Sequence, residues 1–395
     1  MTNEEKFFIE NIRKKLKHAL NAENFIPLHE PNFSGNENKY VSECVNTGWV
    51  SSVGKFVDSF EKNLAEYTGV KRAVAVVNGT SALHISLISV GVKANDEILI
   101  PALTFIATAN AVTYCNAIPH FVDSADDTLG IDPIKLESYL REISEIRNGF
   151  CYNKLTDRRI SAVVPMHTFG HPVDMEKLIE VAEKYNLVIV EDCAESIGSF
   201  YKNIHTGNFG KVAAISFNGN KTITTGGGGA VLTNDEELGK FIKHITTQAK
   251  IPHRWEFSHD YIGYNYRMPN INAALGCAQL EQLNSFIEKK RKLAVKYKNL
   301  FQTIEGIKFF EEPKFAKSNY WLNAIILEKK YQHLRDELLS ELNDNNIMSR
   351  PIWNLMYKMK MYENCPRMNC ETAEEINRRL INIPSSAKLA EDFKK

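Results

Sequence analysis

The feature that most constrains the fold of this chain is the stretch from Ala213 to Ala230, AAISFNGNKTITTGGGGA. It reads as a short apolar strand, a polar turn that carries one lysine, Lys221, and four consecutive glycines at 226–229 that lead directly into a second strand. Adjacent glycines give up side-chain packing and cost conformational entropy. Because strands flank the turn on both sides, we expect backbone that closely approaches something else, rather than a flexible linker.

The lysine of this turn is a candidate nucleophile. Between two buried strands Lys221 would be partly desolvated, which favours the neutral amine, and neutral amines form Schiff bases with carbonyls or pyridoxal phosphate. A phosphate-binding P-loop does not fit, because Asn220 rather than glycine precedes Lys221. A dinucleotide fingerprint starting at Gly226 would end on Val231 inside a strand. An ordinary solvated turn lysine remains the alternative at this point.

Composition excludes several classes of protein. The 48 Lys and Arg residues balance the 48 Asp and Glu residues, so no charge excess points to nucleic acid or an acidic membrane. The apolar runs are far shorter than a membrane span, and the charged N-terminus lacks the apolar core of a signal peptide. The seven cysteines form no C-x-x-C pair, which fits reduced thiols. We expect a cytoplasmic protein without nucleic-acid or membrane partners.

Strands and helices are expected to alternate along the first part of the chain. The expected strands are 73–77, 97–100, 119–122, 160–166 and 187–191, and helices are expected at 80–90, at 105–114 and after Asp132 and Asp174. This alternation predicts an α/β domain with a mostly parallel sheet. Beyond about residue 250 the pattern weakens, with helices at 284–301, 331–343 and 372–379 and a strand at 323–327. We expect an N-terminal helical extension (1–26), a large α/β domain (27–250) and a smaller C-terminal α+β domain (251–395).

Polar groups follow several expected strands, where parallel α/β sheets bind ligands. The run NGTSAL (78–83) can offer helix N-terminal N–H groups to a phosphate, although helix capping is the commoner use. Phe105 can stack on a planar ring or belong to the core. Asp192 can pair with the ring nitrogen of pyridoxal phosphate or cap a helix. With Lys221 and Ser216, the phosphate, ring, ring nitrogen and aldehyde of that cofactor each have a candidate partner.

Seven motifs then occur in order: GWVSSVGKFVDSFE (48–61), NGTSALH (78–84), PALTFIATANAV (101–112), EDCAESIGS (191–199), SFNGNKTITTGGGGAV (216–231), GYNYRMPNINAALG (263–276) and SRPIW (349–353). Together they resemble the DegT/DnrJ/EryC1/StrS aminotransferases, which aminate nucleotide-linked keto sugars with pyridoxal phosphate. The segment LHEPNFSGNE (28–37) and the wording SFNGNK look most like the LegC branch, which makes 4-amino-4,6-dideoxy sugars. The resemblance implies aminotransferase fold type I and a role in polysaccharide biosynthesis.

The resemblance also implies roles for individual residues. Lys221 matches the catalytic lysine, Asp192 the partner of the pyridine nitrogen and Phe105 the aromatic ring that stacks on the cofactor. Matches to further cofactor contacts are Gly79, Thr80, Ser81 and Ser216 at the phosphate, Glu195 near the ring hydroxyl, and Asn265, whose counterpart reaches the phosphate of the partner subunit. The last match implies a homodimer with a shared active site. Substrate contacts are expected at Trp49, His84, Tyr320 and Arg350, with Trp353 in the same group.

The implied reaction is a two-stage transamination. L-glutamate gives its amino group to pyridoxal 5′-phosphate, which leaves pyridoxamine 5′-phosphate, and a keto sugar then takes the amino group, with Lys221 as general base and acid. The expected acceptor is a UDP-linked 4-keto-6-deoxy-N-acetylhexosamine, and the alternatives are GDP-4-keto-6-deoxymannose or a 3-keto sugar.

Three other classes compete with this function. A sugar dehydratase on the same fold has histidine in place of the lysine, a lysine-dependent aldolase would not need Asp192, and a non-catalytic regulator should lack some of these groups. No metal site is expected, because Gly170 and Pro172 break the helix that would bring His167 and His171 onto one face.

Overall fold

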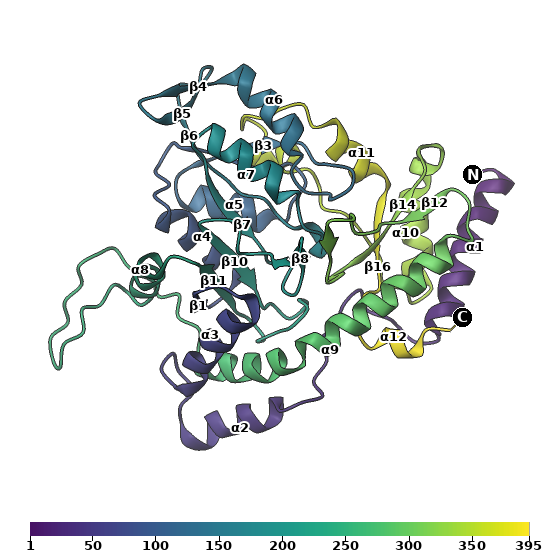
Figure 1. Cartoon of the computed structure of the whole chain (residues 1–395). Coiled ribbons are helices and arrows are strands. Elements are labelled where there is room, and N and C mark those ends of the chain that lie inside the picture. Colours follow the sequence, from purple (N-terminus) through teal and green to yellow (C-terminus); the bar gives the residue numbers. More distant parts are fainter. Residues whose placement is uncertain (395) are drawn as a thin grey trace.

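The computed structural model describes residues 1–394 (Figure 1). Its largest element is a nine-stranded sheet in the order β1-β11-β10-β7-β6-β2-β3, with the β4–β5 hairpin pairing through β5 with β6. Strands β10, β7, β6, β2 and β3 run parallel, whereas β11 is antiparallel to both β1 and β10. The strands are β1 (Arg72–Val76), β2 (Glu97–Pro101), β3 (Ile118–Val122), β4 (Ser144–Arg147), β5 (Phe150–Asn153), β6 (Arg159–Val163), β7 (Val188–Asp192), β10 (Val212–Ser216) and β11 (Gly229–Thr233).

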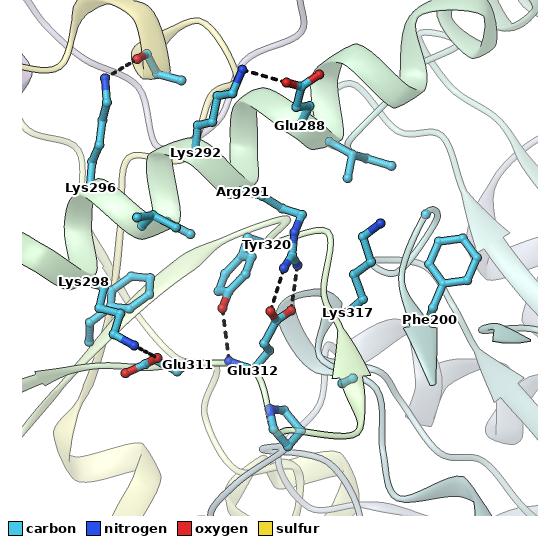
Figure 2. Close-up of a pocket in the computed structure, with 18 of the residues that line it drawn as sticks. Phe200, Glu288, Arg291, Lys292, Lys296, Lys298, Glu311, Glu312, Lys317 and Tyr320 are labelled. Atoms are coloured by element: carbon cyan, nitrogen blue, oxygen red, sulfur yellow. Dashed lines mark hydrogen bonds and ion pairs between the residues drawn. The ribbon is translucent and has the colours of Figure 1, made fainter. Parts of the chain in front are cut away.

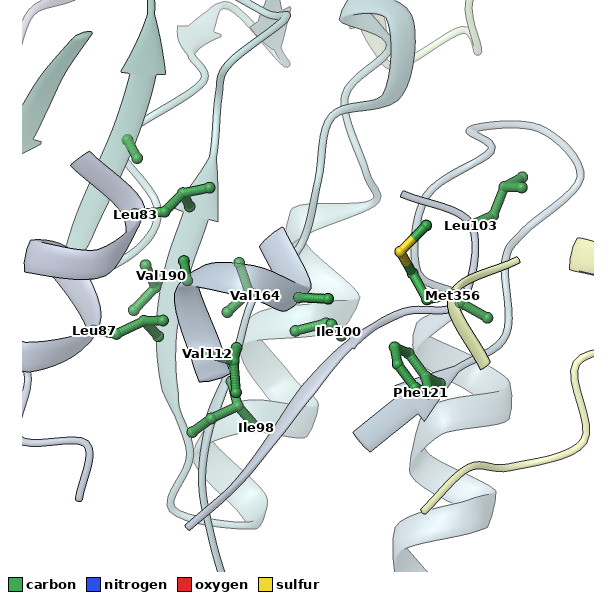
Figure 3. Close-up of a cluster of buried hydrophobic side chains, with 14 of the residues drawn as sticks. Leu83, Leu87, Ile98, Ile100, Leu103, Val112, Phe121, Val164, Val190 and Met356 are labelled. Carbon is green, nitrogen blue, oxygen red and sulfur yellow. The ribbon is translucent and has the colours of Figure 1, made fainter. Parts of the chain in front are cut away.

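Helices cover both faces of this sheet because its strands are apolar on both sides. In β1, Val74 and Val76 join the core under one set of helices, and Ala73 and Ala75 join the core under the other. The first set is α4 (Gly79–Ser89), α5 (Ile106–Tyr114) and α8 (Glu236–Thr246), and Figure 3 shows α4 and α5 side chains on strand side chains. The second set is α3 (Lys55–Thr68), α6 (Pro133–Ile143), α7 (Met175–Lys184) and the first half of α9 (Asn270–Phe301). The predicted α/β class is confirmed.

A second, antiparallel sheet lies in the C-terminal part of the chain. Its order is β12-β14-β16-β15, with β12 (Ile307–Phe309), β14 (Asn323–Leu327), β15 (Arg350–Pro351) and β16 (Leu380–Ile383). Helix α1 (Asn3–Leu20) begins with a Thr2–Glu5 capping box and buries Phe8, Ile12 and Leu16 in the core of this sheet (Figure 1). The N-terminal helix therefore packs on the C-terminal part of the chain.

The remaining elements connect or cover these sheets. They are α2 (Glu37–Thr47), α10 (Arg335–Asp344), α11 (Glu371–Arg379), α12 (Leu389–Asp392), the small sheet of β13 (Ala316–Lys317), β8 (Phe200–Tyr201) and β9 (Ile204–His205), and the 3₁₀ turns Thr168–Gly170, Lys329–Leu334, Met356–Lys358 and Lys360–Tyr362. Within residues 1–394, no helix has both the length and the apolar character that a bilayer span requires. The division at about residues 26 and 250 stays a prediction, and its last residue, 395, lies outside the described range.

Two helices depart from the sequence expectation. Helix α2 is not among the expected helices, because it buries only Glu37 and Cys44 and so has no apolar stripe in its sequence. Helix α9 begins well before the expected Asn284. Its first residue, Asn270, accepts the backbone N–H groups of Phe56 and Val57, and small residues of its first turns pack in the core. Tertiary contacts rather than hydrophobic periodicity therefore set its start.

Candidate active site

A cavity of about 270 Å³ lies where β7 and β10 end and α4 begins. It brings together the predicted residues Gly79, Thr80, Phe105, Asp192, Glu195, Ser216 and Lys221. Asn78, Leu83, Ala107, Met166, Ala194, Asn218, Asn220, Trp321 and Trp353 complete its lining. The cavity sits at the carboxyl ends of parallel strands, which is where this class of sheet binds ligands.

The start of α4 forms an anion-binding corner of the cavity. Asn78 caps the helix by accepting the N–H of Ser81 at 2.7 Å. The N–H groups of Gly79 and Thr80 belong to the first turn, which has no acceptors within the helix, so they can donate to a phosphate. Ser81 itself is buried and is not part of the cavity wall.

Glycines allow the backbone to close around this corner. A Cβ on Gly79 would lie 2.6 Å from the Cβ of Ser216, and a Cβ on Gly229 would lie 2.5 Å from the carbonyl carbon and oxygen of Asn78. Both distances are too short for any side chain. The last glycine of the run therefore presses against the corner itself, and the expected close approach of backbone is confirmed there.

Asp192 is buried at the end of β7. Its Oδ2 accepts the hydroxyl hydrogen of Thr108 at 2.7 Å, and its Oδ1 accepts the N–H of Ala194 at 3.1 Å. Burial raises the pKa of this carboxyl, although the bond from Thr108 opposes the rise. Both donors are neutral, so a buried carboxylate here gains from a cationic N–H such as that of a protonated pyridine ring. Thr108 belongs to the motif PALTFIATANAV (101–112), three residues after Phe105, but it was not identified as a site residue from the sequence.

Lys221 occupies a largely buried position beside a carboxylate. Its side chain is 12% exposed, and its Nζ lies 3.3 Å from Oε1 of Glu195 and 3.9 Å from the centre of the Trp321 ring. The Oε2 of Glu195 accepts the N–H of Phe169 at 2.8 Å. Burial raises the pKa of Glu195 to about 7, against the opposing effect of Lys221. The partial desolvation expected for Lys221 is thus present in its geometry.

Trp321 is a site residue that the sequence did not reveal. Its indole N–H donates to the carbonyl of Asn220 at 2.7 Å, and its backbone N–H donates to Oδ1 of Asn319 at 2.8 Å. Asn319 in turn donates to the carbonyls of Glu195 and Ile197, both at 2.9 Å. The irregular segment around Trp321 lies between β13 and β14, so only the tertiary fold brings it to Lys221.

The predicted Tyr320 lies on the other side of this segment. It lines a separate cavity of about 1050 Å³ beside α9, where its hydroxyl accepts the N–H of Glu312 at 3.2 Å and Arg291 forms a two-pronged ion pair with Glu312 (Figure 2). Tyr320 has a positive φ of 49°, which turns its side chain away from that of Trp321. The structure therefore places the neighbouring residue, Trp321, in the cavity with Lys221.

Of the other predicted contacts, Trp353 lines the first cavity, whereas the predicted substrate contacts Trp49, His84 and Arg350 and the predicted partner contact Asn265 do not. His84 is a buried residue of α4, and its Nδ1 lies 3.0 Å from the hydroxyl oxygen of Tyr266. Trp49 is exposed, and its carbonyl accepts a hydrogen bond from Asn270. Asn265 is exposed and bonded to Arg267. Arg350 lines a second cavity of about 570 Å³, which shares Phe105, Asn220, Trp321 and Trp353 with the first.

A buried cluster of His167, Glu191 and Cys193 lies next to Asp192 and offers metal-ligand atoms close together. Each oxygen of Glu191 already has partners within the chain: Oε1 accepts the N–H groups of Phe209 and Gly210, and Oε2 accepts from Gly207 and lies 3.1 Å from Nε2 of His167. The cluster therefore braces the end of β7. His171, the other histidine of the H-x-x-x-H spacing, packs against Phe310 and Tyr320.

The donor set of the first cavity fits pyridoxal phosphate: an anion-binding helix start, a buried carboxylate and a lysine amine. The sequence profile of the DegT/DnrJ/EryC1/StrS aminotransferase family matches residues 31–394. The chain belongs to this family. It is therefore a pyridoxal-phosphate-dependent aminotransferase, and the predicted cofactor and enzyme class are confirmed.

Relatives of this aminotransferase carry names of sugar-modifying enzymes. It is 39% identical to the GDP-perosamine synthase of Escherichia coli O157:H7, over 93% of this chain and 95% of that protein. It is 31% identical to the UDP-4-amino-4,6-dideoxy-N-acetyl-beta-L-altrosamine transaminase of Campylobacter jejuni, over 84% of this chain and 85% of that one. The structure of Helicobacter pylori PseC, an aminotransferase of pseudoaminic acid biosynthesis, superimposes with a TM-score of 0.84 at 26% identity, covering 93% and 97% of the two chains. Fold type I is thereby confirmed.

Proposed function

We propose that this aminotransferase transfers an amino group from L-glutamate to C4 of a nucleotide-linked 4-keto-6-deoxy sugar, in the cytoplasm, for surface-glycan biosynthesis. The observation that carries the proposal is that two cavities lie side by side and share the lining residues Phe105, Asn220, Trp321 and Trp353. One cavity has the groups that a pyridoxal cofactor needs. The other, larger cavity of about 570 Å³ is adjacent to the first and provides room for an acceptor.

The cofactor-binding roles follow from the geometry of the first cavity. The N–H groups of Gly79 and Thr80, with the hydroxyl of Ser216, would hold the phosphate, and Asp192 would hold the ring nitrogen. Phe105 would pack on the ring. When bound, pyridoxal phosphate supplies an electron sink and a carbonyl that exchanges with amines.

Lys221 is the group placed to move protons at the reacting carbon. Its amine is largely screened from water and lies against the Trp321 ring, within 3.3 Å of Glu195. A general base must reach the proton that it takes, and in this cavity Lys221 is the amine at that position. Glu195, with a pKa of about 7, can exchange a proton with its surroundings near neutral pH.

The second cavity has the composition expected for a polar, ring-shaped acceptor. Trp353, Trp321 and several methionines supply apolar walls, while Arg350, His29 and Asn382 supply polar groups. Aromatic faces with a few placed polar side chains are typical of small-molecule sites. Arg350 can pair with phosphate oxygens of the nucleotide.

The higher identity to a relative named for a GDP-linked product favours a GDP-linked acceptor, GDP-4-keto-6-deoxymannose. This was the alternative in the sequence analysis. The UDP-linked N-acetylhexosamine that the LegC resemblance implied is the second candidate, favoured by the relative named for a UDP-linked sugar at lower identity.

We further propose a homodimer with shared active sites. The segment 250–262, here called the arm, projects from the body between α8 and α9 (Figure 1) and exposes Trp255, Phe257 and Ile262 by 69%, 80% and 79%. Such a concentration of exposed apolar side chains favours a protein partner. Asn265 at the base of the arm is exposed and does not line the cavity of its own chain, which fits a residue that serves a second copy.

The test is a pair of half-reactions followed by absorbance and mass spectrometry. L-glutamate should convert the visible absorbance of the bound cofactor to that of the pyridoxamine form, and GDP-4-keto-6-deoxymannose should restore it and yield an amino sugar. The UDP-linked keto sugar serves as the competing acceptor, and folded Lys221→Ala protein serves as the inactive control. Turnover by Lys221→Ala, or the absence of amino sugar from both acceptors, would contradict the proposal.

A further inference from the structure

Lys290 is a buried lysine that the proposed reaction does not use. It lies in α9 with no exposed surface, and its Nζ donates to the carbonyl oxygens of Trp321 at 3.1 Å and Ser385 at 2.5 Å. Both hydrogen-bond partners are neutral. Burial lowers the pKa of this amine to about 7. Burying an ammonium group in this way costs free energy, which indicates that its role lies with the two carbonyl groups to which Lys290 donates.

The first of its two acceptors belongs to the residue that packs on the catalytic lysine. Three polar atoms of Trp321 are hydrogen-bonded, each to a different segment: the backbone N–H to Asn319, the indole N–H to Asn220, and the carbonyl to Lys290. The ring that these bonds orient lies 3.9 Å from Nζ of Lys221. Lys290 is thus one hydrogen bond away from the wall of the cofactor cavity.

The second hydrogen-bond acceptor, the carbonyl oxygen of Ser385, links the Lys290 amine to the second cavity, here called the acceptor cavity because it is proposed to bind the keto sugar. The N–H of Ser385 donates to the carbonyl of Leu28, and its hydroxyl accepts the N–H of Asn323 at 2.7 Å. Leu28 and Leu322, the residue after Trp321, both line the acceptor cavity. Lys290 therefore joins α9 to two chain segments that meet at the boundary between the two cavities.

We propose that Lys290 is a positioning residue for the reaction: by holding the carbonyl of Trp321 and the 384–386 segment together, it fixes the Trp321 ring against Lys221. The inference rests on the proposed role of Lys221. Without the bond from Lys290 the carbonyl of Trp321 is buried without its donor, and the residue can turn about its remaining bonds. The ring would then no longer define the position of the Lys221 amine.

The decisive variant is Lys290→Met, which keeps the length and apolar stem of the side chain but cannot donate. We expect kcat to fall about tenfold or more with KM for the keto sugar little changed, because small displacements of a reacting group cost rate rather than binding. Lys290→Arg, which restores donors, should recover most of kcat. Lys292→Met on the exposed side of the same helix is the matched control and should leave kcat unchanged.

A spectroscopic readout separates positioning from a general loss of structure. The pH titration of the visible absorbance of the holoenzyme reports the surroundings of Lys221 and needs no keto sugar. We expect its midpoint to move by about half a pH unit or more in Lys290→Met and to stay in place in Lys292→Met. If wild type lacks any response to L-glutamate, the proposed function fails. If wild type responds and Lys290→Met matches it in titration and kcat, only the positioning role fails.

A double-mutant cycle tests whether Lys290 acts through Trp321. In a Trp321→Phe background, which keeps the carbonyl but lacks the indole N–H, adding Lys290→Met should cost about twofold or less instead of tenfold. Full additivity of the two effects would overturn the proposal. Should Lys290→Met fail to fold, Lys290→Leu, which is also apolar and cannot donate, takes its place in the same comparisons, and equal kcat and titration of that variant and wild type would count against the proposal.

Discussion

At the scale of residues, Glu195 is a buried carboxyl that lies beside Lys221, and its burial raises its pKa. Glu195 is 2% exposed, and its position beside Lys221 reduces the penalty of that burial without removing it, so the carboxyl pKa stays at about 7. The Glu195 carboxyl can therefore gain or lose a proton near neutral pH.

This raised pKa predicts how the cofactor-free protein responds to pH. The folded state holds a proton on Glu195 up to pH 7, whereas the unfolded chain releases it near 4.5, so folding stability from this group falls as pH rises through that window. Relative to Glu195→Gln, wild type should lose up to about 3 kcal/mol of unfolding free energy between pH 4.5 and 7. Urea unfolding of both proteins across this range measures it. A constant difference at all pH values would contradict the raised pKa.

At the scale of elements, the β10–turn–β11 hairpin supplies three residues of the candidate site. It supplies Ser216 at the end of β10, Lys221 on the turn, and Gly229 at the start of β11. The antiparallel pairing of β10 with β11 and of β11 with β1 brings Gly229 beside Asn78, which follows β1. The anion-binding corner and Lys221 are thereby positioned by the same sheet.

Substituting two glycines of the run tests whether the run is needed for close backbone contact with Asn78 or only for flexibility. Gly229→Ala would place a Cβ 2.5 Å from the backbone of Asn78 and 2.8 Å from the nitrogen of Gly79, so the corner must open. We expect cofactor affinity to drop about tenfold or more, since the two N–H donors lose their alignment. Gly227→Ala is the matched control, because its Cβ would meet no atom within 4 Å. Cofactor titration by absorbance compares them, and equal affinities in the two variants would refute the role of Gly229.

What the sequence could predict follows from how local each signal is. The β10–turn–β11 hairpin, the capped start of α4 and Asp192 at the end of β7 are written in short runs of residues, and the structure brings them together. Trp321, Asn319 and Lys290 join the site from the segment between β13 and β14 and from another helix, so no local pattern marks them. Tyr320 was chosen in place of Trp321 because neighbouring residues of an irregular segment cannot be assigned a direction without the fold.

At the scale of the whole molecule, the arm exposes apolar side chains that contact with a second copy of the chain would bury. Within the arm, Ile251 donates to the carbonyl of Ser258 and Lys250 pairs with His259, and only its end contacts α8, through Asp260 to His244 and Tyr261 to Phe241. An isolated two-stranded arm is marginally stable in water, and exposed Trp255 and Phe257 add to the cost. Burial in an interface accounts for both features.

Polar substitution in the arm should therefore dissociate the protein. We expect the triple variant Trp255→Ser, Phe257→Ser, Ile262→Ser to shift the species seen by light scattering from dimer to monomer at micromolar concentration, because about 25 cal/mol is lost per Å² of apolar interface. Leu155→Ser, which changes a residue that is 84% exposed far along the chain, is the matched control and should stay dimeric. A variant that remains dimeric would show that the arm serves another purpose.

Shared active sites make a sharper prediction, because they allow two inactive subunits to rescue each other. If Asn265 serves the partner, a mixed dimer of Lys221→Ala and Asn265→Ala subunits contains one site with both defects and one site with neither. Random pairing in a co-expressed sample should then give about one quarter of wild-type specific activity, although each variant alone is inactive or strongly impaired. The control pairs Lys221→Ala with Asp192→Ala. Both of these residues line the cavity of their own chain, so every site in the mixed dimer carries one defect and no activity should return. Equal activity from the two mixtures would mean that Asn265 acts within its own subunit, or not in the site at all.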